Sequence, residues 1–318
     1  MFFTEVRPEK SVRPIQHCDK IWTIGSCFAD EIGRRLADDL FDIRVNPCGT
    51  LYNPASVSRM LRRIIAGEHY TANDIFEHNG LWHCMDFHSS FSAYTPDETL
   101  ARINSIVTTL HNELPRLSRL MITFGSARAF IDRQSGHAAG NCHKLPASRF
   151  ETRDLPAEWI ADDFTAVVND LRKVNPGLSV IFTVSPIRHK AYGYHADKLS
   201  KATLLLAEDI ICRATESEYF PSYEIMTDEL RDYRFYAPDM IHPSATACDH
   251  IYMRFGEAFF TRDTAALAAE CRKFTLRSRH RPVNRETVEY RQFEKATAEI
   301  KSRLLESHPE LAAAIRCY

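Results

Sequence analysis

The sequence predicts an α/β fold in which helices cover both faces of a parallel sheet. Short, uniformly apolar runs at 20–24, 120–124 and 178–184 end at glycine or in a polar loop. Such runs are typical of parallel strands that are buried on both faces. Amphipathic helical patterns alternate with these runs, as crossover connections require. From Ala265 onward strand patterns are absent, which predicts a helical appendage.

The individual helices are indicated by periodicity and by capping residues. Apolar residues recur every four positions from Phe28 to Leu40. Thr95 precedes Pro96, which predicts an N-cap followed by proline at the first helical position. We expect further helices starting near Pro54 and over residues 160–171, 199–214, 244–259, 286–305 and 310–315, and a strand-like segment over 219–226.

These elements predict two regions. We expect residues 1–262 to form an α/β domain, and residues 263–318 to form a helical extension that either wraps the core or mediates homo-oligomer contacts. A polar insertion at about 69–92 interrupts the alternation of strands and helices. We expect its aromatic residues to pack it onto the domain.

Composition narrows the class of protein and of partner. The chain has 318 residues and a formal net charge of −2, so nucleic acid and anionic membranes are not expected partners. We expect no membrane-spanning helix, because no apolar run reaches about 18 residues. We also expect no signal peptide, because Met1–Pro8 opens without a long apolar run. Its nine cysteines are scattered, without a C-x-x-C pair. We therefore expect free thiols and a cytoplasmic location.

Three segments place reactive side chains just beyond expected strands. Ser26 and Cys27 follow the first strand, where a helix begins. Asp239 and His242 are three residues apart, so that the carboxylate can orient the imidazole and leave its second nitrogen as a general base. Residues 180–189 form a buried strand that opens into a loop carrying Arg188 and His189 as substrate-binding candidates.

The insertion also contains a dense set of metal-ligand types. A metal-dependent hydrolase is therefore one alternative, although the spacing matches no established metal motif and we expect no metal. The candidate ligands are His78, His83, Asp86, His88 and His143.

The chain resembles the SGNH/GDSL hydrolase superfamily and, more closely, the GSCFA-domain family of bacterial proteins. The resemblance spans roughly residues 15–260. It rests on Gly25-Ser26-Cys27-Phe28-Ala29 together with residues 46–54, 86–89, 141–144, 183–189, 219–224 and 231–236. It implies a flavodoxin-like three-layer sandwich.

The resemblance also implies site residues. The superfamily's G-D-S block falls on Gly25, Ser26 and Cys27, which makes Cys27 the favoured nucleophile and Ser26 the alternative. The D-x-x-H-P block falls on Asp239 and His242. For the oxyanion hole the match implies Gly49.

The third superfamily block, G-x-N-D, departs from the pattern. Ala127 stands where the asparagine is expected, and Asn141 is our candidate replacement in the oxyanion hole.

The leading functional expectation is an esterase or acyltransferase that acts on an ester or thioester, with a carbohydrate ester as one candidate substrate. It needs no cofactor, although a transferase could use acyl-CoA as donor. Near a helix N-terminus and an imidazole, we expect the pKa of Cys27 to be lowered. A non-catalytic binding protein on the same scaffold is the second alternative. Candidate substrate contacts are Arg188, His189, Lys144, His143 and His88.

Overall fold

The central sheet has five parallel strands in the order β2-β1-β5-β8-β9. The computed structural model describes residues 4–281 and 287–315. The strands are β1 (Lys20–Gly25), β2 (Asp42–Val45), β5 (Arg119–Phe124), β8 (Ser179–Val184) and β9 (Glu218–Tyr219). Counted along the chain, the sheet strands are ordered 2-1-3-4-5, which is the flavodoxin-like arrangement. β5 and β8 are buried along their whole length, so they read as continuous apolar runs.

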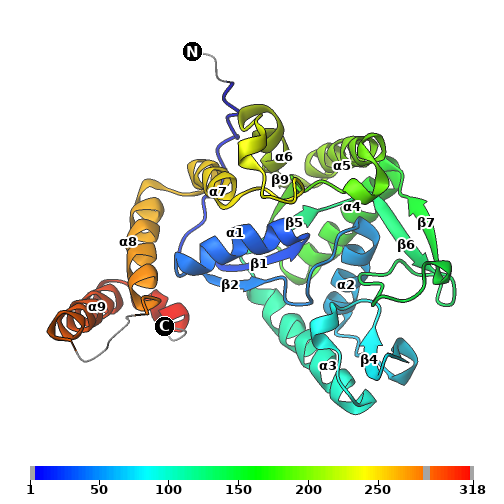
Figure 1. Ribbon diagram of the computed structural model, residues 1–318, viewed down its shortest axis with the longest axis horizontal. Coiled ribbons are helices and arrows are strands. Elements are labelled where there is room, and N and C mark those ends of the chain that lie inside the picture. The colour runs from blue at the N-terminus through cyan, green and yellow to red at the C-terminus, as the bar shows by residue number, and fades with distance from the viewer. Residues whose placement is uncertain (1–3, 282–286, 316–318) are drawn as a thin grey trace.

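Helices cover both faces of this sheet (Figure 1). Trp22 and Ile24 of β1 point into one core, where they pack with residues of four helices. Ile21 points into the opposite core. The first face is covered by α2 (Pro54–Ala66), α3 (Pro96–Glu113), α4 (Ala157–Val174) and α5 (Tyr194–Thr215), and the second by α1 (Cys27–Asp38), α6 (Ser222–Glu224) and α7 (Ala245–Phe259).

Two antiparallel hairpins are added to the sandwich. The polar insertion contains β3 (Ile75–His78) and β4 (Leu81–Cys84). A second hairpin pairs β6 (Arg128–Asp132) with β7 (Phe150–Asp154). The sequence patterns did not predict these strands or β2, because short strands with mixed polarity leave a weak periodic signal.

The C-terminal helices form a third apolar cluster at one end of the molecule (Figure 1). They are α8 (Arg262–Ser278), α9 (Val288–Ser307) and α10 (Ala312–Ile315). Leu40, just after the C-cap of α1, belongs to the same cluster as Phe274 and Leu304. The predicted domain boundary at 262/263 therefore falls at the beginning of α8. Residue 286 of the helix predicted over 286–305 lies outside the described residues.

The predicted strand over 219–226 is wrong beyond its first residue. β9 ends at Tyr219, and α6 and the π-helical residues Ile225–Glu229 follow. Pro221 has no backbone N–H to donate, so it cannot continue a strand pairing. Within residues 4–281 and 287–315, none of the helices has the length and apolar character that a membrane crossing requires.

Candidate active site

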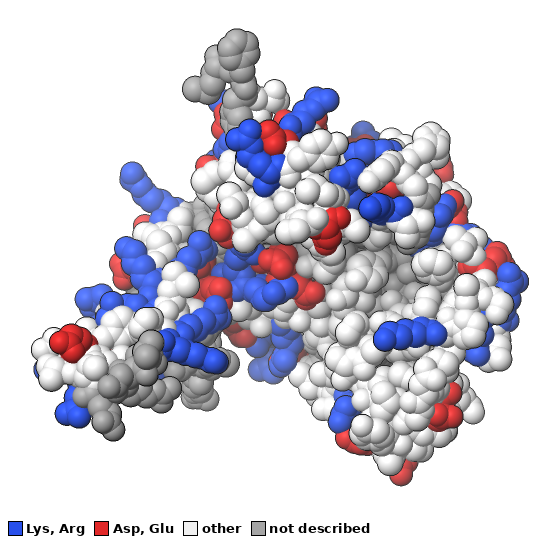
Figure 2. Space-filling view, in the orientation of Figure 1, with Lys and Arg blue, Asp and Glu red and all other residues white. Residues whose placement is uncertain are grey.

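The reactive residues predicted from sequence lie at the carboxyl edge of the sheet, next to its topological switch point. The chain leaves β1 for β2 on one side, and β5 lies on the other side of β1. A crevice between two such strands is the usual ligand site of an open parallel sheet. In the view of Figure 2 the molecule is hollowed near its centre, on the side to which the arrowhead of β1 points in Figure 1.

The turn between β1 and α1 fixes the roles of Ser26 and Cys27. Gly25 has φ +140°, and a Cβ there would lie 2.1 Å from the carbonyl oxygen of Thr123, so only glycine fits. Ser26 is 1% exposed, and its Oγ accepts a hydrogen bond from the Phe28 amide as the N-cap of α1. Cys27 is the first residue of the helix and is half-buried. The serine hydroxyl is therefore used by the backbone, whereas the thiol faces the crevice.

Asp239 and His242 form a compact turn opposite Cys27. Asp239 Oδ1 accepts the amides of Ile241 and His242 at 2.9 and 3.0 Å, and its Oδ2 lies 2.6 Å from Nδ1 of His242. Nε2 of the same ring lies 3.7 Å from Sγ of Cys27. The Asp239 carboxylate accepts a hydrogen bond from Nδ1 of His242, so Nδ1 carries the ring proton. Nε2 is then left as a hydrogen-bond acceptor. The hydrogen bond from His242, supported by the two amides, lowers the pKa of Asp239 to about 2.

The expectation that the Cys27 pKa is lowered is wrong. Burial raises the pKa of the thiol, and the negative charge of Asp30 in the first turn of α1 raises it further. A hydrogen bond with the Tyr52 side chain acts in the opposite direction. At neutral pH the free protein therefore keeps Cys27 as a thiol, so attack needs a base to remove its proton.

Cys27 and His242 line a pocket of about 460 Å³, together with Asn141, Arg188 and His189. His189 Nε2 lies 3.1 Å from the carbonyl oxygen of Gly125. Burial, followed by the charge of Lys201, lowers the pKa of His189 to about 4, which keeps it neutral at pH 7. Arg188 stacks over the rings of Tyr194 and Tyr236.

Other predicted contacts do not line this pocket. His143 is buried, and its ring nitrogens lie 3.2 Å from Ser89 Oγ and 2.7 Å from the carbonyl oxygen of Cys84. Lys144 and His88 are exposed outside the pocket lining. His143 as a substrate contact is therefore wrong, because its hydrogen-bonding groups already serve the polar insertion.

The predicted oxyanion hole is only partly assembled. The amide of Gly49 donates to the carbonyl of Asn46 at 2.7 Å, and Gly49 does not line the pocket. A Cβ at Gly49 would lie 2.1 Å from Cβ of His88, so this glycine permits close chain packing. Asn141 does line the pocket. Its Oδ1 accepts the His143 amide, which leaves Nδ2 as its donor group. Gly49 as an oxyanion donor is therefore contradicted, and Asn141 stays a candidate.

Sequence reasoning missed two residues beside the reactive set. Tyr52 lines the pocket, and its ring packs edge-on against His189 with centroids 6.1 Å apart. Lys201 is 1% exposed and donates to the carbonyls of Gly125 and Ser185 at 2.6 and 2.7 Å. It ties together the ends of β5 and β8. Lys201 shares the buried face of α5 with Leu204 and Ile211 but also with Glu208, so the sequence pattern gave no clear signal for it.

The candidate metal ligands of the insertion do not converge. His83 lies within hydrogen-bond distance of Ser92 Oγ and of the His78 carbonyl, and Asp86 accepts from Arg59 and Tyr70. Throughout the described part of the chain, there is no group of three or more histidine, cysteine, aspartate or glutamate side chains placed to hold a metal ion.

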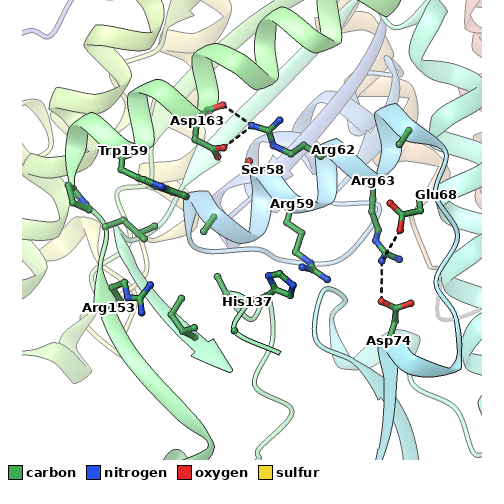
Figure 3. A pocket seen from close by; sticks show the side chains of 17 residues that line it. Ser58, Arg59, Arg62, Arg63, Glu68, Asp74, His137, Arg153, Trp159 and Asp163 are labelled. Carbon is green, nitrogen blue, oxygen red and sulfur yellow. Dashed lines mark hydrogen bonds and ion pairs between the residues drawn. The ribbon is translucent and has the colours of Figure 1, made fainter. Parts of the chain in front are cut away.

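Another hollow, larger than this pocket, lies away from Cys27 and has a different character. It measures about 880 Å³ and is lined by arginines of α2 facing Trp159 and the β6–β7 hairpin (Figure 3). Arg62 pairs with Asp163 at 2.8 Å and Arg63 with Asp74 at 3.1 Å. Its arginines are held by carboxylates, and Cys27 and His242 are not among its lining residues. The smaller pocket is therefore the candidate active site.

Together, the fold and this pocket define a flavodoxin-like α/β protein with a cysteine, a histidine and an aspartate aligned in its switch-point crevice. The chain belongs to the GSCFA family, whose model matches residues 20–255. Among curated proteins there is no match. A solved structure of a suggested GDSL-like lipase from Parabacteroides merdae is similar, with 13% identity and a TM-score of 0.34, over 79% of this chain and 99% of that one. A TM-score this low does not establish a common fold.

Proposed function

We propose that this chain is an SGNH-type acyl-transfer enzyme that cleaves an ester or thioester through Cys27. The observation that carries the proposal is the continuous series of contacts from Cys27 Sγ to His242 Nε2 and from His242 Nδ1 to Asp239 Oδ2. A nucleophile, a base and a carboxylate that orients the base are the three elements of nucleophilic acyl transfer. Residues 27 and 242 are far apart in the sequence, so the fold alone brings them together.

The reaction begins with proton transfer from the thiol to Nε2 of His242 while sulfur attacks the acyl carbon. The oxyanion that forms is stabilised by the N-terminus of α1 and by Nδ2 of Asn141. The bond from the acyl carbon to the leaving oxygen or sulfur then breaks, and His242 returns the proton to the leaving group. An acyl-thioester on Cys27 remains.

The thioester is resolved by a second nucleophile. Water gives a carboxylic acid, and an acceptor hydroxyl gives a new ester, with His242 removing the proton in either case. Cys27 regains its proton from His242 and the enzyme is restored. An acyl donor such as acyl-CoA would enter by the same route, because its thioester also forms an acyl-cysteine.

The test uses 4-nitrophenyl acetate as substrate. Cys27→Ala should reduce kcat/KM by roughly a thousandfold or more, as loss of a nucleophile does. Asp239→Asn should reduce it strongly while the thiol remains, because the imidazole loses the carboxylate that selects its tautomer. Cys142→Ala is the matched control, since Cys142 lines the same pocket and is also half-buried.

Ser26→Ala distinguishes the two candidate nucleophiles. Loss of the N-cap should cost about 1 kcal/mol of stability, and part of the activity should remain. If Cys27→Ala stays active while Ser26→Ala is inactive and no longer reacts with a fluorophosphonate, the nucleophile is the serine. If the wild-type chain turns over neither this ester nor its thioester analogue, the chain is a binding protein on this scaffold.

A further inference from the structure

A second hollow of about 550 Å³ adjoins the candidate active site. Arg188 lines both spaces, so the two hollows meet at this side chain. The hollow is formed where the beginning of α5 meets residues 226–236. Its volume falls within the roughly 300–1,000 Å³ that small-molecule pockets occupy.

Three tyrosine side chains, Tyr194, Tyr233 and Tyr236, line this hollow. Tyr194 is 51% exposed and Tyr233 is 73% exposed, whereas Tyr236 is half-buried. The guanidinium of Arg188 lies 4.7 Å from the ring centre of Tyr194 and 5.2 Å from that of Tyr236. This stacking holds the arginine in place between the two spaces. Exposed aromatic rings beside a pocket offer flat apolar faces together with hydroxyl groups.

The charges around the hollow balance. Its cations are Arg188, Lys198 and Arg231, and its anions are Asp197, Asp228 and Asp232. Such a lining gives no net preference for a phosphate or a carboxylate. It does supply both hydrogen-bond donors and acceptors next to aromatic faces. A neutral ligand with many hydroxyl groups and apolar C–H faces matches this combination.

The active-site pocket is different, because apolar residues form a larger share of its wall. Phe130, Ile187 and Ile241 line it beside the reactive pair. An apolar wall suits the acyl part of an ester, and the tyrosine-lined hollow suits the alcohol part. An ester that fills both spaces would therefore place its acyl part in one and its alcohol part in the other, with the bond that Cys27 would cleave between them.

We propose that the hollow lined by Tyr194, Tyr233 and Tyr236 binds a neutral saccharide as the alcohol part of the substrate. This inference rests on the proposed function. Cys27 attacks the acyl group of an O-acylated saccharide, the bond from the acyl carbon to the sugar oxygen breaks, and His242 gives its proton to that oxygen. Water then releases the carboxylic acid, so an acylated sugar and water become a free sugar and an acid.

The test compares 4-nitrophenyl acetate with monoacetylated xylobiose and monoacetylated maltose. The small ester needs only the active-site pocket, whereas the sugar esters need both spaces. One of the two sugar esters is chosen as the substrate because the wild type hydrolyses it. Tyr233→Ala and Tyr194→Ala should each raise the KM for this ester about fivefold, as loss of an aromatic contact does. For Tyr233→Ala, kcat/KM for 4-nitrophenyl acetate should change by less than about twofold. Tyr194→Ala is compared by its KM for the sugar ester alone, because the Tyr194 ring also stacks on Arg188. Tyr94→Ala is the control for loss of an exposed tyrosine, because Tyr94 is 81% exposed and lies just before α3, outside both spaces.

A direct binding measurement separates this inference from the proposed function. Xylobiose and maltose are titrated into Cys27→Ala while the tyrosine resonances are followed by NMR. Shifts at Tyr194 and Tyr233 in Cys27→Ala, with the Tyr194 shift lost when Tyr233→Ala is added, support the saccharide site even if no ester is turned over. If neither sugar binds, or if Tyr233→Ala affects the small ester as strongly as the sugar ester, the saccharide assignment is overturned while the cysteine mechanism stands.

Discussion

The guanidinium of Arg188 donates from Nη1 to the carbonyl oxygen of Met240 at 3.1 Å. The backbone amide of Arg188 also donates to the carbonyl of Ile241 at 3.2 Å. Met240 has φ +58°, in the left-handed region that costs energy for a residue with a side chain. The loop after β8 therefore holds the strained turn that carries Asp239 and His242.

Arg188→Met should reduce kcat for 4-nitrophenyl acetate by about tenfold or more while KM changes less. Loss of the side-chain bond lets the turn relax, and a small displacement of His242 from Cys27 is costly to the reaction. Arg188→Lys should recover part of the rate. Arg231→Met removes a cation from the adjoining hollow only and should leave the rate for this ester unchanged. Equal losses for all three variants would contradict a positioning role.

Alkylation of Cys27 by iodoacetamide should show a pH midpoint above the value of about 8.5 of a free cysteine. Burial and the charge of Asp30 disfavour the thiolate. Asp30→Asn should lower the midpoint, because it removes the negative charge. The exposed Cys18, followed in the same digest by mass spectrometry, provides the reference. A midpoint below 7 would show that the site activates the thiol before substrate binds.

The stability difference between the wild type and Lys201→Met should increase with pH above 8. Burial lowers the pKa of Lys201 from 10.5 to about 8. Between these values the unfolded chain binds more protons than the folded chain, so rising pH favours folding. Across this pH range, the stability difference between the two proteins should change by on the order of 3 kcal/mol. Denaturant unfolding at several pH values measures it, with Lys198→Met as the control for loss of an exposed lysine. A pH-independent difference would contradict the prediction.

Arg272→Met should destabilise the protein by about 2–3 kcal/mol. Asp39 is 1% exposed, and its carboxylate accepts two bonds from Arg272 at 2.7 Å and one from Tyr252 at 2.6 Å. Loss of the arginine would leave a buried charge without its cation. Arg279→Met, which removes an exposed partner of Asp38, should cost less than about 1 kcal/mol. Similar costs for both variants would show that α8 is not anchored through Asp39.

Treatment with EDTA should leave both the turnover of 4-nitrophenyl acetate and the thermal midpoint unchanged. In the structure, His83 and His143 hydrogen-bond to Ser92, Ser89 and backbone carbonyls. Elemental analysis of the purified protein provides the second measurement. Stoichiometric zinc, manganese or iron, with activity lost to chelator and restored by the metal, would contradict a metal-free mechanism.

Local sequence was sufficient for much of the fold. Uniformly apolar runs identified β1, β5 and β8, because strands covered on both faces need apolar side chains at every position. Thr95, Ser244 and Pro54 marked helix beginnings correctly, since caps act through bonds within a few residues. The sequence patterns missed β2 and both hairpins, because short strands of mixed polarity leave a weak periodic signal.

For the candidate site, the sequence by itself determined the reactive residue types and the local D-x-x-H turn, because three residues suffice to join Asp239 to His242. Only the tertiary structure decided which nucleophile faces His242 and that Gly49 and His143 are engaged elsewhere. It also decided that Tyr52 lies beside the thiol and that Lys201 joins the ends of β5 and β8. It also reversed the expected direction of the Cys27 pKa. Burial is the largest cause of that shift, and burial depends on packing from distant segments, which no local pattern contains.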